Sequence, residues 1–256
     1  MKWHPERYAL ALLLLVFSPA LRAEAVVVVE HWPPWEIVDA ETGEVMGGKA
    51  VELTRALFAR LDVEVSFRNV PWQRALTQIR QGRADIIPMI TRNLVRTNDM
   101  AFSNPIYQDQ LLLVSAASQH KDGTCRWDRP GALAGKTVGV TRDYVYGPNW
   151  STLRKDRRLR LARSNTDLSH LKKAMGARVD YSLQYYSFLQ SSLTDPELDR
   201  DELLFCKPPV EEIALRFGIS RRSPLAERMP EINQALEAMK EDGSYRALLG
   251  ELYREP

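Results

Sequence analysis

The alternation of strand and helix patterns along the chain is the feature that most constrains its fold. Successive patterns indicate a strand at 26–29, a helix at 53–61, a strand at 63–67, a short helix at 76–79 and a strand at 85–87. The first strand is a run of valines, whereas the first helix repeats leucine every four residues. This order of elements predicts a parallel sheet that is covered by helices.

The same alternation begins again in the second half of the chain. Strand patterns lie at 111–114, 137–140 and 178–182, and helix patterns lie at 168–174 and 232–239. Two α/β units in one chain predict two lobes with a cleft between them. Since open α/β sheets bind ligands at the carboxyl ends of their strands, we expect a small-molecule site in that cleft.

Residues 1–23 have the layout of a secretory signal peptide. Lys2 and Arg7 give a positive start, and residues 9–17 form an apolar run that is too short to span a bilayer. Small residues follow, so cleavage is expected after Ala23 or Ala25. The sequence therefore predicts an exported protein.

The charge balance gives no reason to expect nucleic acid or an anionic membrane as a partner. The full chain has 35 basic and 33 acidic residues, and removal of residues 1–23, which hold three basic residues and one acidic residue, leaves 32 of each. Such a chain lacks the basic surplus that is typical of proteins that bind nucleic acid. No later segment of the sequence is apolar over the length of a membrane span.

The chain contains two cysteines, Cys125 and Cys206. In an exported protein such a pair predicts one disulfide, because compartments outside the cytoplasm are oxidising. The loop that it closes is long, so chain entropy would contribute roughly 4–5 kcal/mol at most. Two free buried thiols are the alternative.

The histidines that follow the leader give no metal-binding pattern. His31, His120 and His170 are far apart in the sequence and lack the spacing of metal ligands. We interpret them as surface or turn residues, and we expect no metal and no cofactor. The segment GALAGKT (131–137) has three rather than four residues between its glycines and leads into a strand, so it is not interpreted as a phosphate-binding loop.

Six segments, in an order that covers nearly the whole chain after residue 23, carry a family resemblance. They are HWPPWE (31–36), VPWQRALTQIRQGRADII (70–87), TRNLVRTNDMAFSNPIY (91–107), LAGKTVGV (133–140), MGARVDYSLQYY (175–186) and MKEDGSYRALLGELY (239–253). Together they resemble the bacterial extracellular solute-binding proteins of family 3, the periplasmic amino-acid-binding proteins of ABC importers.

The resemblance implies an α/β fold of the two-lobed periplasmic-binding-protein class (type II). Each lobe would be a mostly parallel sheet flanked by helices, and two hinge crossings would join the lobes. Lobe I would comprise residues 24–110 and 212–256, and lobe II residues 111–211, which include both cysteines. The implied protein is a monomeric periplasmic receptor that binds a small molecule and delivers it to a membrane ABC permease.

Arg96 stands six residues before Phe102, where the family places the arginine that clamps the ligand's α-carboxylate. A planar guanidinium suits this task because it forms two parallel hydrogen bonds with a carboxylate. The resemblance also implies that Thr91 offers a hydroxyl to the same carboxylate. A surface position or a structural ion pair is the alternative for Arg96, a turn position is the alternative for Thr91, and Arg92 is a nearby competitor.

Trp32 and Trp72 match positions where the family stacks aromatic side chains on the ligand, and we expect them to face each other. Trp32 follows the carboxyl end of the first strand, a placement that favours a site over a core position. A partly buried core tryptophan is the alternative for both. Trp35 matches a family aromatic that packs into lobe I, so we interpret it as a core residue.

The sequence also departs from the family pattern. Tyr185 stands where amino-acid binders carry the aspartate that holds the ligand's ammonium, and a tyrosine supplies no full negative charge at neutral pH. Arg142 and Asp143 replace a Gly-Thr or Gly-Ser pair, and either can reach the cleft. Glu30 or Asp143 would then hold a cationic group, with solvated carboxylates as the alternative. The expected ligand is a small polar, carboxylate-bearing molecule, either an amino acid or a related compound.

Two other functions stay open for this sequence. Some relatives are periplasmic dehydratases of the cyclohexadienyl or arogenate type, and Tyr185, Glu30 and Asp143 could belong to such a pocket, although no convincing acid–base pair is present. A signalling module that presents its ligand to a membrane receptor would show the same sequence features. We expect a binding protein rather than an enzyme.

Overall fold

The computed structural model describes residues 24–128, 131–196 and 198–253. The predicted signal peptide, residues 1–23, lies outside the described residues. In the described part, no helix combines the length and the apolar character that crossing a membrane requires.

Within the described residues, ten strands form one mixed sheet. Its strands are β1 (Glu24–Val29), β4 (Glu64–Asn69), β5 (Ile86–Thr91), β6 (Met100–Phe102), β7 (Tyr107–Ala116), β8 (Thr137–Thr141), β9 (Arg160–Ser164), β10 (Tyr181–Tyr185), β11 (Leu203–Phe205) and β12 (Glu211–Ser220). The order along the sheet is β4-β1-β5-β12-β7-β10-β8-β9, with β6 paired to β12 and β11 paired to β7. A separate hairpin joins β2 (Ile37–Val38) to β3 (Val45–Gly47).

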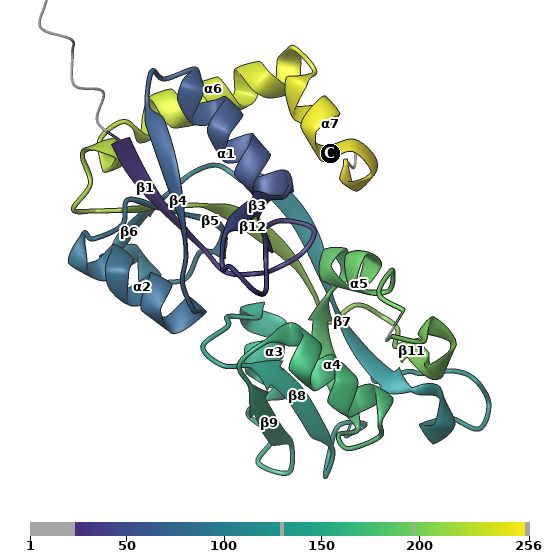
Figure 1. Ribbon diagram of the computed structural model, residues 1–256. Helices are drawn as coiled ribbons and strands as arrows, with labels where there is room; N and C mark the ends of the chain where they lie inside the picture. The colour runs from purple at the N-terminus through teal and green to yellow at the C-terminus, as the bar shows by residue number, and fades with distance from the viewer. Residues whose placement is uncertain (1–23, 129–130, 197, 254–256) are drawn as a thin grey trace, which may run out of the picture.

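The helices divide into two groups, one for each end of the sheet (Figure 1). The α-helices are α1 (Lys49–Ala59), α2 (Trp72–Gln81), α3 (Gly147–Leu153), α4 (Asp167–Met175), α5 (Tyr186–Ser192), α6 (Met229–Glu241) and α7 (Ser244–Leu249). The 3₁₀ helices are η1 (Arg96–Asn98), η2 (Ala117–Gln119), η3 (Arg200–Glu202), η4 (Pro224–Ala226) and η5 (Gly250–Leu252). We call the end built on β4, β1 and β5 with α1, α2, α6 and α7 the first lobe, and the end built on β10, β8 and β9 with α3, α4 and α5 the second lobe.

The valine run at the start of the chain shows why helices cover both faces of the first lobe. Successive strand residues point to opposite faces. Val27 belongs to the same buried cluster as Leu53 and Leu57 of α1, whereas Val28 belongs to the cluster that holds Ile79 of α2. A strand buried on both faces reads as a continuous apolar run, as is typical of parallel sheets. Both strand pairs that β1 forms, with β4 and with β5, are parallel.

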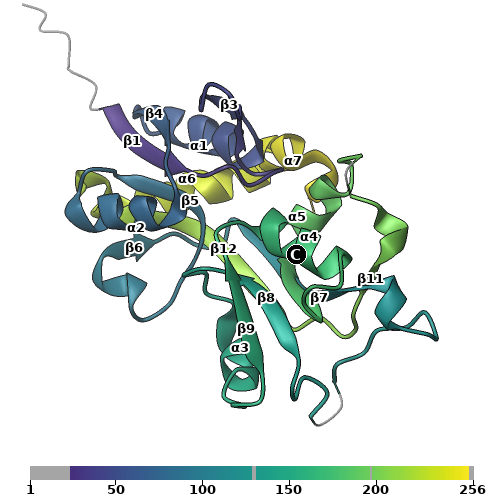
Figure 2. The same cartoon turned by 60° about the horizontal axis from the view of Figure 1, so that its bottom comes forward.

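Two long strands, β7 and β12, carry the chain between the lobes. They pair antiparallel with each other over residues 107–111 and 211–215. Beyond this shared segment, β12 pairs with β5 of the first lobe and β7 pairs with β10 of the second lobe. Figure 2 shows the two strands between the lobes from a second direction. These antiparallel crossings make the sheet continuous, rather than two separate sheets.

The strand predicted at 178–182 begins later than expected, at Tyr181. The backbone just before it still closes the end of α4, since the amide of Ala177 donates to the carbonyl of Ala174 and the amide of Arg178 donates to that of Lys173. Ala177 also has a positive φ of 52°. The turn therefore uses residues that the apolar pattern alone assigned to the strand.

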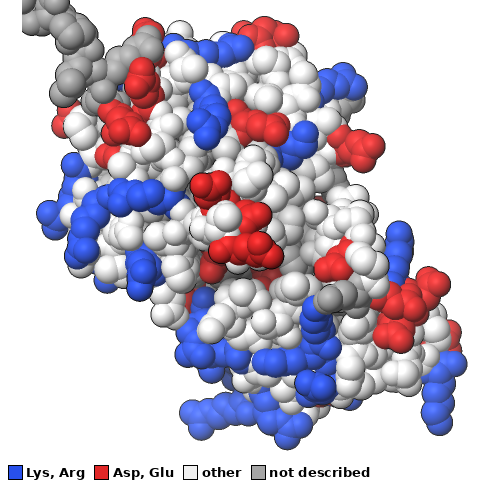
Figure 3. Space-filling view, in the orientation of Figure 1, with Lys and Arg blue, Asp and Glu red and all other residues white. Residues whose placement is uncertain are grey.

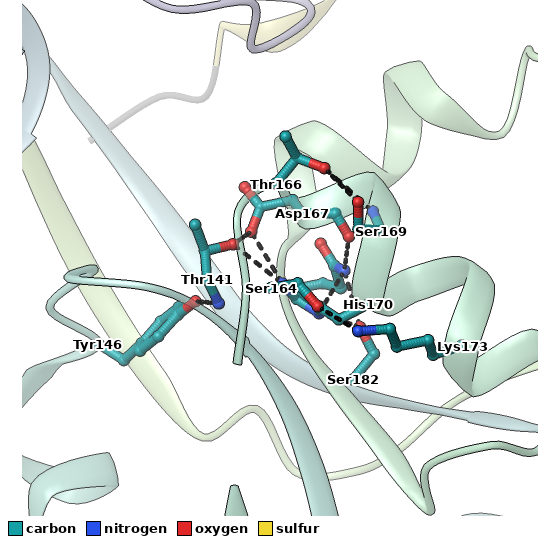
Figure 4. A network of polar contacts seen from close by, with 10 residues as sticks. Thr141, Tyr146, Ser164, Thr166, Asp167, Ser169, His170, Lys173 and Ser182 are labelled. Atoms are coloured by element: carbon teal, nitrogen blue, oxygen red, sulfur yellow. Dashed lines mark hydrogen bonds and ion pairs between the residues drawn. The ribbon is translucent and has the colours of Figure 1, made fainter. Parts of the chain in front are cut away.

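The interpretation of His170 as a surface or turn residue is wrong, because this side chain is fully buried in the second lobe. Its Nδ1 lies 2.7 Å from Ser182 Oγ, and its Nε2 lies 3.0 Å from Thr141 Oγ1 and 3.2 Å from Asp167 Oδ1 (Figure 4). A Cβ at position 139 would come within 2.7 Å of the His170 side chain, so Gly139 makes room for this packing.

The predicted disulfide is confirmed, since Cys125 and Cys206 are joined by an S–S bond. Cys206 follows β11, and its amide donates to the carbonyl of Leu113 in β7. The bond thus fastens the loop after β7 to the second lobe and does not join the two lobes.

Replacement of both cysteines, Cys125→Ser with Cys206→Ser, is expected to lower the free energy of unfolding by about 2–5 kcal/mol, because the bond joins residues 81 positions apart in the sequence. Urea unfolding followed by tryptophan fluorescence measures this change, with the wild type under reducing conditions as the control. An unchanged free energy of unfolding would contradict a stabilising role for the bond.

Candidate ligand-binding cleft

The candidate site lies where the carboxyl ends of strands from both lobes meet. Glu30 and Trp32 follow β1, and Thr91 ends β5. From the second lobe, Tyr144 follows β8 and Tyr185 ends β10. Parallel strands bring such positions to one edge of each sheet, which is where open α/β sheets bind ligands.

These side chains line a narrow cavity between the lobes, and the empty space of about 500 Å³ around it includes open solvent. Its lining residues are Val28, Val29, Glu30, Trp32, Glu36, Trp72, Ala75, Ile87, Pro88, Met89, Ile90, Thr91, Arg96, Tyr144, Val145 and Tyr185. Six of the eight ligand-binding candidates that the sequence suggested therefore lie together, and the exceptions are Arg142 and Asp143.

Arg96 is the buried cation of this cavity, with 7% of its surface exposed. Its Nη1 donates to the carbonyl oxygen of Thr91 at 2.8 Å and to the Thr91 hydroxyl at 2.6 Å. Its guanidinium carbon lies 5.3 Å from the centre of the Trp72 ring. Burial lowers the pKa of Arg96 to about 10, so the side chain stays protonated at neutral pH. Within the described residues, no carboxylate forms an ion pair with Arg96.

Asp143 bridges the lobes through its backbone rather than by turning its carboxylate into the cavity. Its carbonyl oxygen accepts hydrogen bonds, each 3.4 Å long, from Trp72 Nε1 and Arg96 Nη2. Its carboxylate accepts from Gln73 Nε2 at 2.7 Å and is exposed. Arg142 is exposed and does not line the cavity, so the expectation that Arg142 or the Asp143 carboxylate contributes to this pocket is not supported by their placement.

Trp32 and Trp72, which we expected to face each other, both line the cavity, and each packs against a tyrosine. Trp32 packs edge-on against Tyr185, with ring centres 5.1 Å apart, and Trp72 packs edge-on against Tyr144 at 5.3 Å. Tyr144 and Tyr185 lie 6.3 Å apart. Each of these two tryptophans of the first lobe thus meets a tyrosine of the second. Sequence reasoning missed Tyr144, although its position just after a predicted strand was the signal that could have found it.

Trp35 is separate from the cavity and fully buried. Its ring packs against Tyr107 with centres 4.6 Å apart, and its Nε1 donates to Ser187 Oγ at 2.9 Å. Ser187 lies in α5, so this core residue contacts the second lobe as well as its own.

Two carboxyl groups of the first lobe face the cavity, and burial disfavours charge on both. Burial raises the pKa of Glu30 to about 7, while a hydrogen bond from the Trp72 backbone opposes this shift and the charge of Asp167 adds to it. Glu36, which sequence reasoning missed, has 4% of its surface exposed. Burial, and to a smaller extent the charge of Glu30, raises the pKa of Glu36 well above its ordinary value. Figure 3 shows acidic side chains in the hollow between the lobes.

A sequence model of one family, described as bacterial extracellular solute-binding proteins, family 3, matches residues 25–253. The chain belongs to this family. The match confirms the resemblance noted in the sequence, and it spans both lobes and both crossing strands. No curated protein sequence matches the chain.

Solved structures of related proteins confirm the two-lobed α/β fold. An ancestral arginine-binding protein bound to arginine is 20% identical and superposes with a TM-score of 0.75 over 91% of this chain and 99% of its own. The substrate-binding protein of an amino acid ABC transporter is 15% identical, with a TM-score of 0.73 over 91% and 100% of the two chains. A histidine kinase sensor domain with similarity to periplasmic binding proteins is 20% identical, with a TM-score of 0.76 over 92% and 99%.

The raised pKa of Glu30 predicts that the stability of the folded protein depends on pH. Because the folded state holds the Glu30 proton up to a pKa of about 7, against an ordinary value of 4.5, unfolding between these pH values releases a proton. Stability is therefore expected to fall as the pH rises from about 4.5 to about 7, and Glu30→Gln should make this fall shallower. Urea unfolding at several pH values measures the slope.

The exposed Glu44→Gln is the matched control for this measurement, since it lies away from the cavity. Equal slopes for Glu30→Gln and the wild type would contradict the assignment of a half-buried, protonated carboxyl to Glu30.

Proposed function

We propose that this protein is a periplasmic receptor that binds a small polar, carboxylate-bearing ligand in the cleft between its lobes. The ligand is an amino acid or a related molecule, and the loaded receptor delivers it to an ABC permease. The observation that carries this proposal is the buried guanidinium of Arg96, which faces the cavity without a carboxylate partner among the described residues. In this proposal the signal peptide, residues 1–23, directs export and the receptor acts as a monomer without a cofactor.

A ligand carboxylate is the group to which Arg96 is best placed to donate hydrogen bonds. Thr91 and Trp72 hold the guanidinium in one orientation, so little further ordering is needed when a ligand binds. Hydrogen bonds to charged groups contribute about 1.5–3 kcal/mol each, more than those between neutral groups. Burial removes the water that would compete for the guanidinium, which favours an anionic ligand group at this position.

Hinge closure around the ligand follows from the two crossing strands. We propose that the lobes comprise residues 24–110 with 212–256 and residues 111–211, and that they move about β7 and β12. A ligand that contacts both Arg96 and Tyr185 binds the closed form more tightly than the open form, and this difference in affinity drives closure. The arginine bound in one related structure, and the description of another as the substrate-binding protein of an amino acid transporter, support this class of ligand.

Two alternative functions would use the same cleft. The similarity to a histidine kinase sensor domain supports a role in which the closed receptor signals to a membrane partner. A dehydratase of the cyclohexadienyl or arogenate type would find in Glu30, with a pKa of about 7, a group able to donate a proton at neutral pH. Turnover of prephenate or arogenate by the purified protein would replace the receptor proposal with this second function.

Arg96→Gln is expected to weaken the binding of a carboxylate ligand at least about tenfold, because it removes the charge from the hydrogen bonds to the carboxylate. Calorimetric titration of the purified protein with amino acids, opines and small dicarboxylates identifies the ligand and measures this loss. The neighbouring Arg92→Gln is the control, since Arg92 is exposed and lies outside the cavity. Equal affinity of Arg96→Gln and the wild type would rule out the carboxylate clamp.

The two tryptophans of the first turn are expected to respond differently to truncation. Trp32→Ala removes a wall of the cavity and should weaken ligand binding at least about tenfold, a loss of about 1.4 kcal/mol. Trp35→Ala leaves a large void in the core and should lower the free energy of unfolding by about 3–5 kcal/mol. Titration and urea unfolding of both variants separate the effects, and a larger loss of affinity in Trp35→Ala would reverse the assignment.

A further inference from the structure

Charge is unevenly distributed along the chain, although the whole chain after residue 23 is balanced. The segment 136–180, which belongs to the second lobe, holds 11 basic and four acidic residues. Since the chain after residue 23 has 32 of each, its remaining part holds 21 basic and 28 acidic residues. Such an asymmetry of charge between parts of a chain indicates an anionic partner for the basic part. The even total, which gave no reason to expect an anionic membrane as a partner, conceals this asymmetry.

The topology of the second lobe brings many of these basic residues to one end of the molecule. Strand β8 is parallel to both β9 and β10, so the amino ends of the three strands lie at one edge of the sheet. Their carboxyl ends face the cleft, and the amino ends therefore lie away from it. Basic residues stand at the start of each strand or at most five residues before it. They are Lys136, Lys155, Arg157, Arg158, Arg160 and Arg178, and we call this group the basic pole.

Two carboxylates accompany the basic pole among the described residues at these strand starts, and both already hold a partner. Asp156 Oδ2 lies 2.8 Å from Arg158 Nη2, and Asp180 Oδ1 lies 2.9 Å from Lys136 Nζ. Arg160 donates to two neutral oxygens, a hydroxyl and a backbone carbonyl. These contacts cancel part of the positive charge and leave the rest of it available.

The remaining charge belongs to Lys155, Arg157 and Arg178. All three side chains are exposed, and none forms an ion pair with a carboxylate in the part of the chain that the structure describes. In Figure 3 lysine and arginine side chains gather over the end of the second lobe that points away from the first lobe. The basic pole is thus an outward-facing surface with a surplus of positive charge.

The surroundings of the basic pole favour lipid headgroups over a protein or a nucleic acid. Among the described residues, the exposed large hydrophobic side chains are Ile37, Met46, Leu94 and Val95, and all four belong to the first lobe. A specific protein interface has an apolar centre, and single-stranded nucleic acid stacks on aromatic side chains. Long basic side chains without such neighbours suit a surface of diffuse negative charge, as anionic lipid headgroups provide.

We propose that the basic pole binds the surface of a membrane that contains anionic lipids, by electrostatic attraction to their headgroups. This inference goes beyond the proposed receptor function and rests only on the export that is part of it, which brings the chain to a membrane surface. Contact through the amino ends of the strands leaves the cleft, at their carboxyl ends, open to ligand. The protein then stays near the membrane while it collects its ligand.

Flotation of the purified mature protein with lipid vesicles tests the basic pole. Vesicles that contain anionic phosphatidylglycerol should carry the protein, whereas vesicles of phosphatidylcholine alone should not. Because 1 M salt shortens the reach of a charge to about 3 Å, binding should be lost there. Each basic residue near an anionic membrane raises the affinity roughly fivefold. The triple variant Lys155→Gln, Arg157→Gln and Arg178→Gln should therefore bind at least about twentyfold more weakly.

The triple variant Arg74→Gln, Arg83→Gln and Arg200→Gln is the matched control, since it removes the same charge from exposed positions outside the basic pole. A thermal melt shows whether each variant is folded. If the first triple variant is not, Arg178→Gln alone should bind roughly fivefold more weakly.

Three results would overturn the basic pole: equal flotation with both kinds of vesicle, undiminished affinity in its variants, or an equal loss in the control. Binding to heparin without binding to vesicles would also overturn it, in favour of a soluble polyanion. None of these results affects ligand binding in the cleft. The receptor proposal fails separately, when titration with candidate ligands gives no binding.

Discussion

The buried positive charge of Arg96 is the constraint on which the rest of the cleft depends. A guanidinium removed from water needs hydrogen-bond acceptors, and the chain provides them from both lobes: the carbonyl and hydroxyl of Thr91 and, more distantly, the carbonyl of Asp143. Trp72 adds an aromatic face. These neutral partners orient the charge without cancelling it. An anionic group placed in the cavity would therefore meet a prepared site.

The architecture explains how one small molecule can hold two lobes together. The ends of β1 and β5 face the ends of β8 and β10, so each lobe contributes residues from the same kind of position. Aromatic pairs, Trp32 with Tyr185 and Trp72 with Tyr144, join the lobes across the cavity. The antiparallel strands β7 and β12 are the connection described between the two ends of the sheet. The disulfide lies within the second lobe and leaves that connection unrestrained.

Sequence reasoning found the groups whose positions follow from local patterns. Arg96 and Trp72 were suggested by the resemblance to the family, whose motifs could be matched residue by residue to this sequence. It misplaced the Asp143 carboxylate, because this residue has a positive φ of 61° and presents its carbonyl oxygen to Arg96. It also misread His170, whose burial depends on the missing side chain of Gly139 and on partners that only the fold brings near. Such features arise from the folded backbone and from packing between distant segments, so they leave no periodic pattern in the sequence.

The most direct test of the account is a crystal structure of the purified protein with a small molecule bound between its lobes. The account predicts a carboxylate of that molecule within hydrogen-bond distance of the Arg96 guanidinium, enclosed between Trp32 and Trp72 of the first lobe and Tyr185 of the second. A ligand bound between the lobes whose acidic group lies elsewhere, with Arg96 paired to a carboxylate of the protein itself, would contradict it.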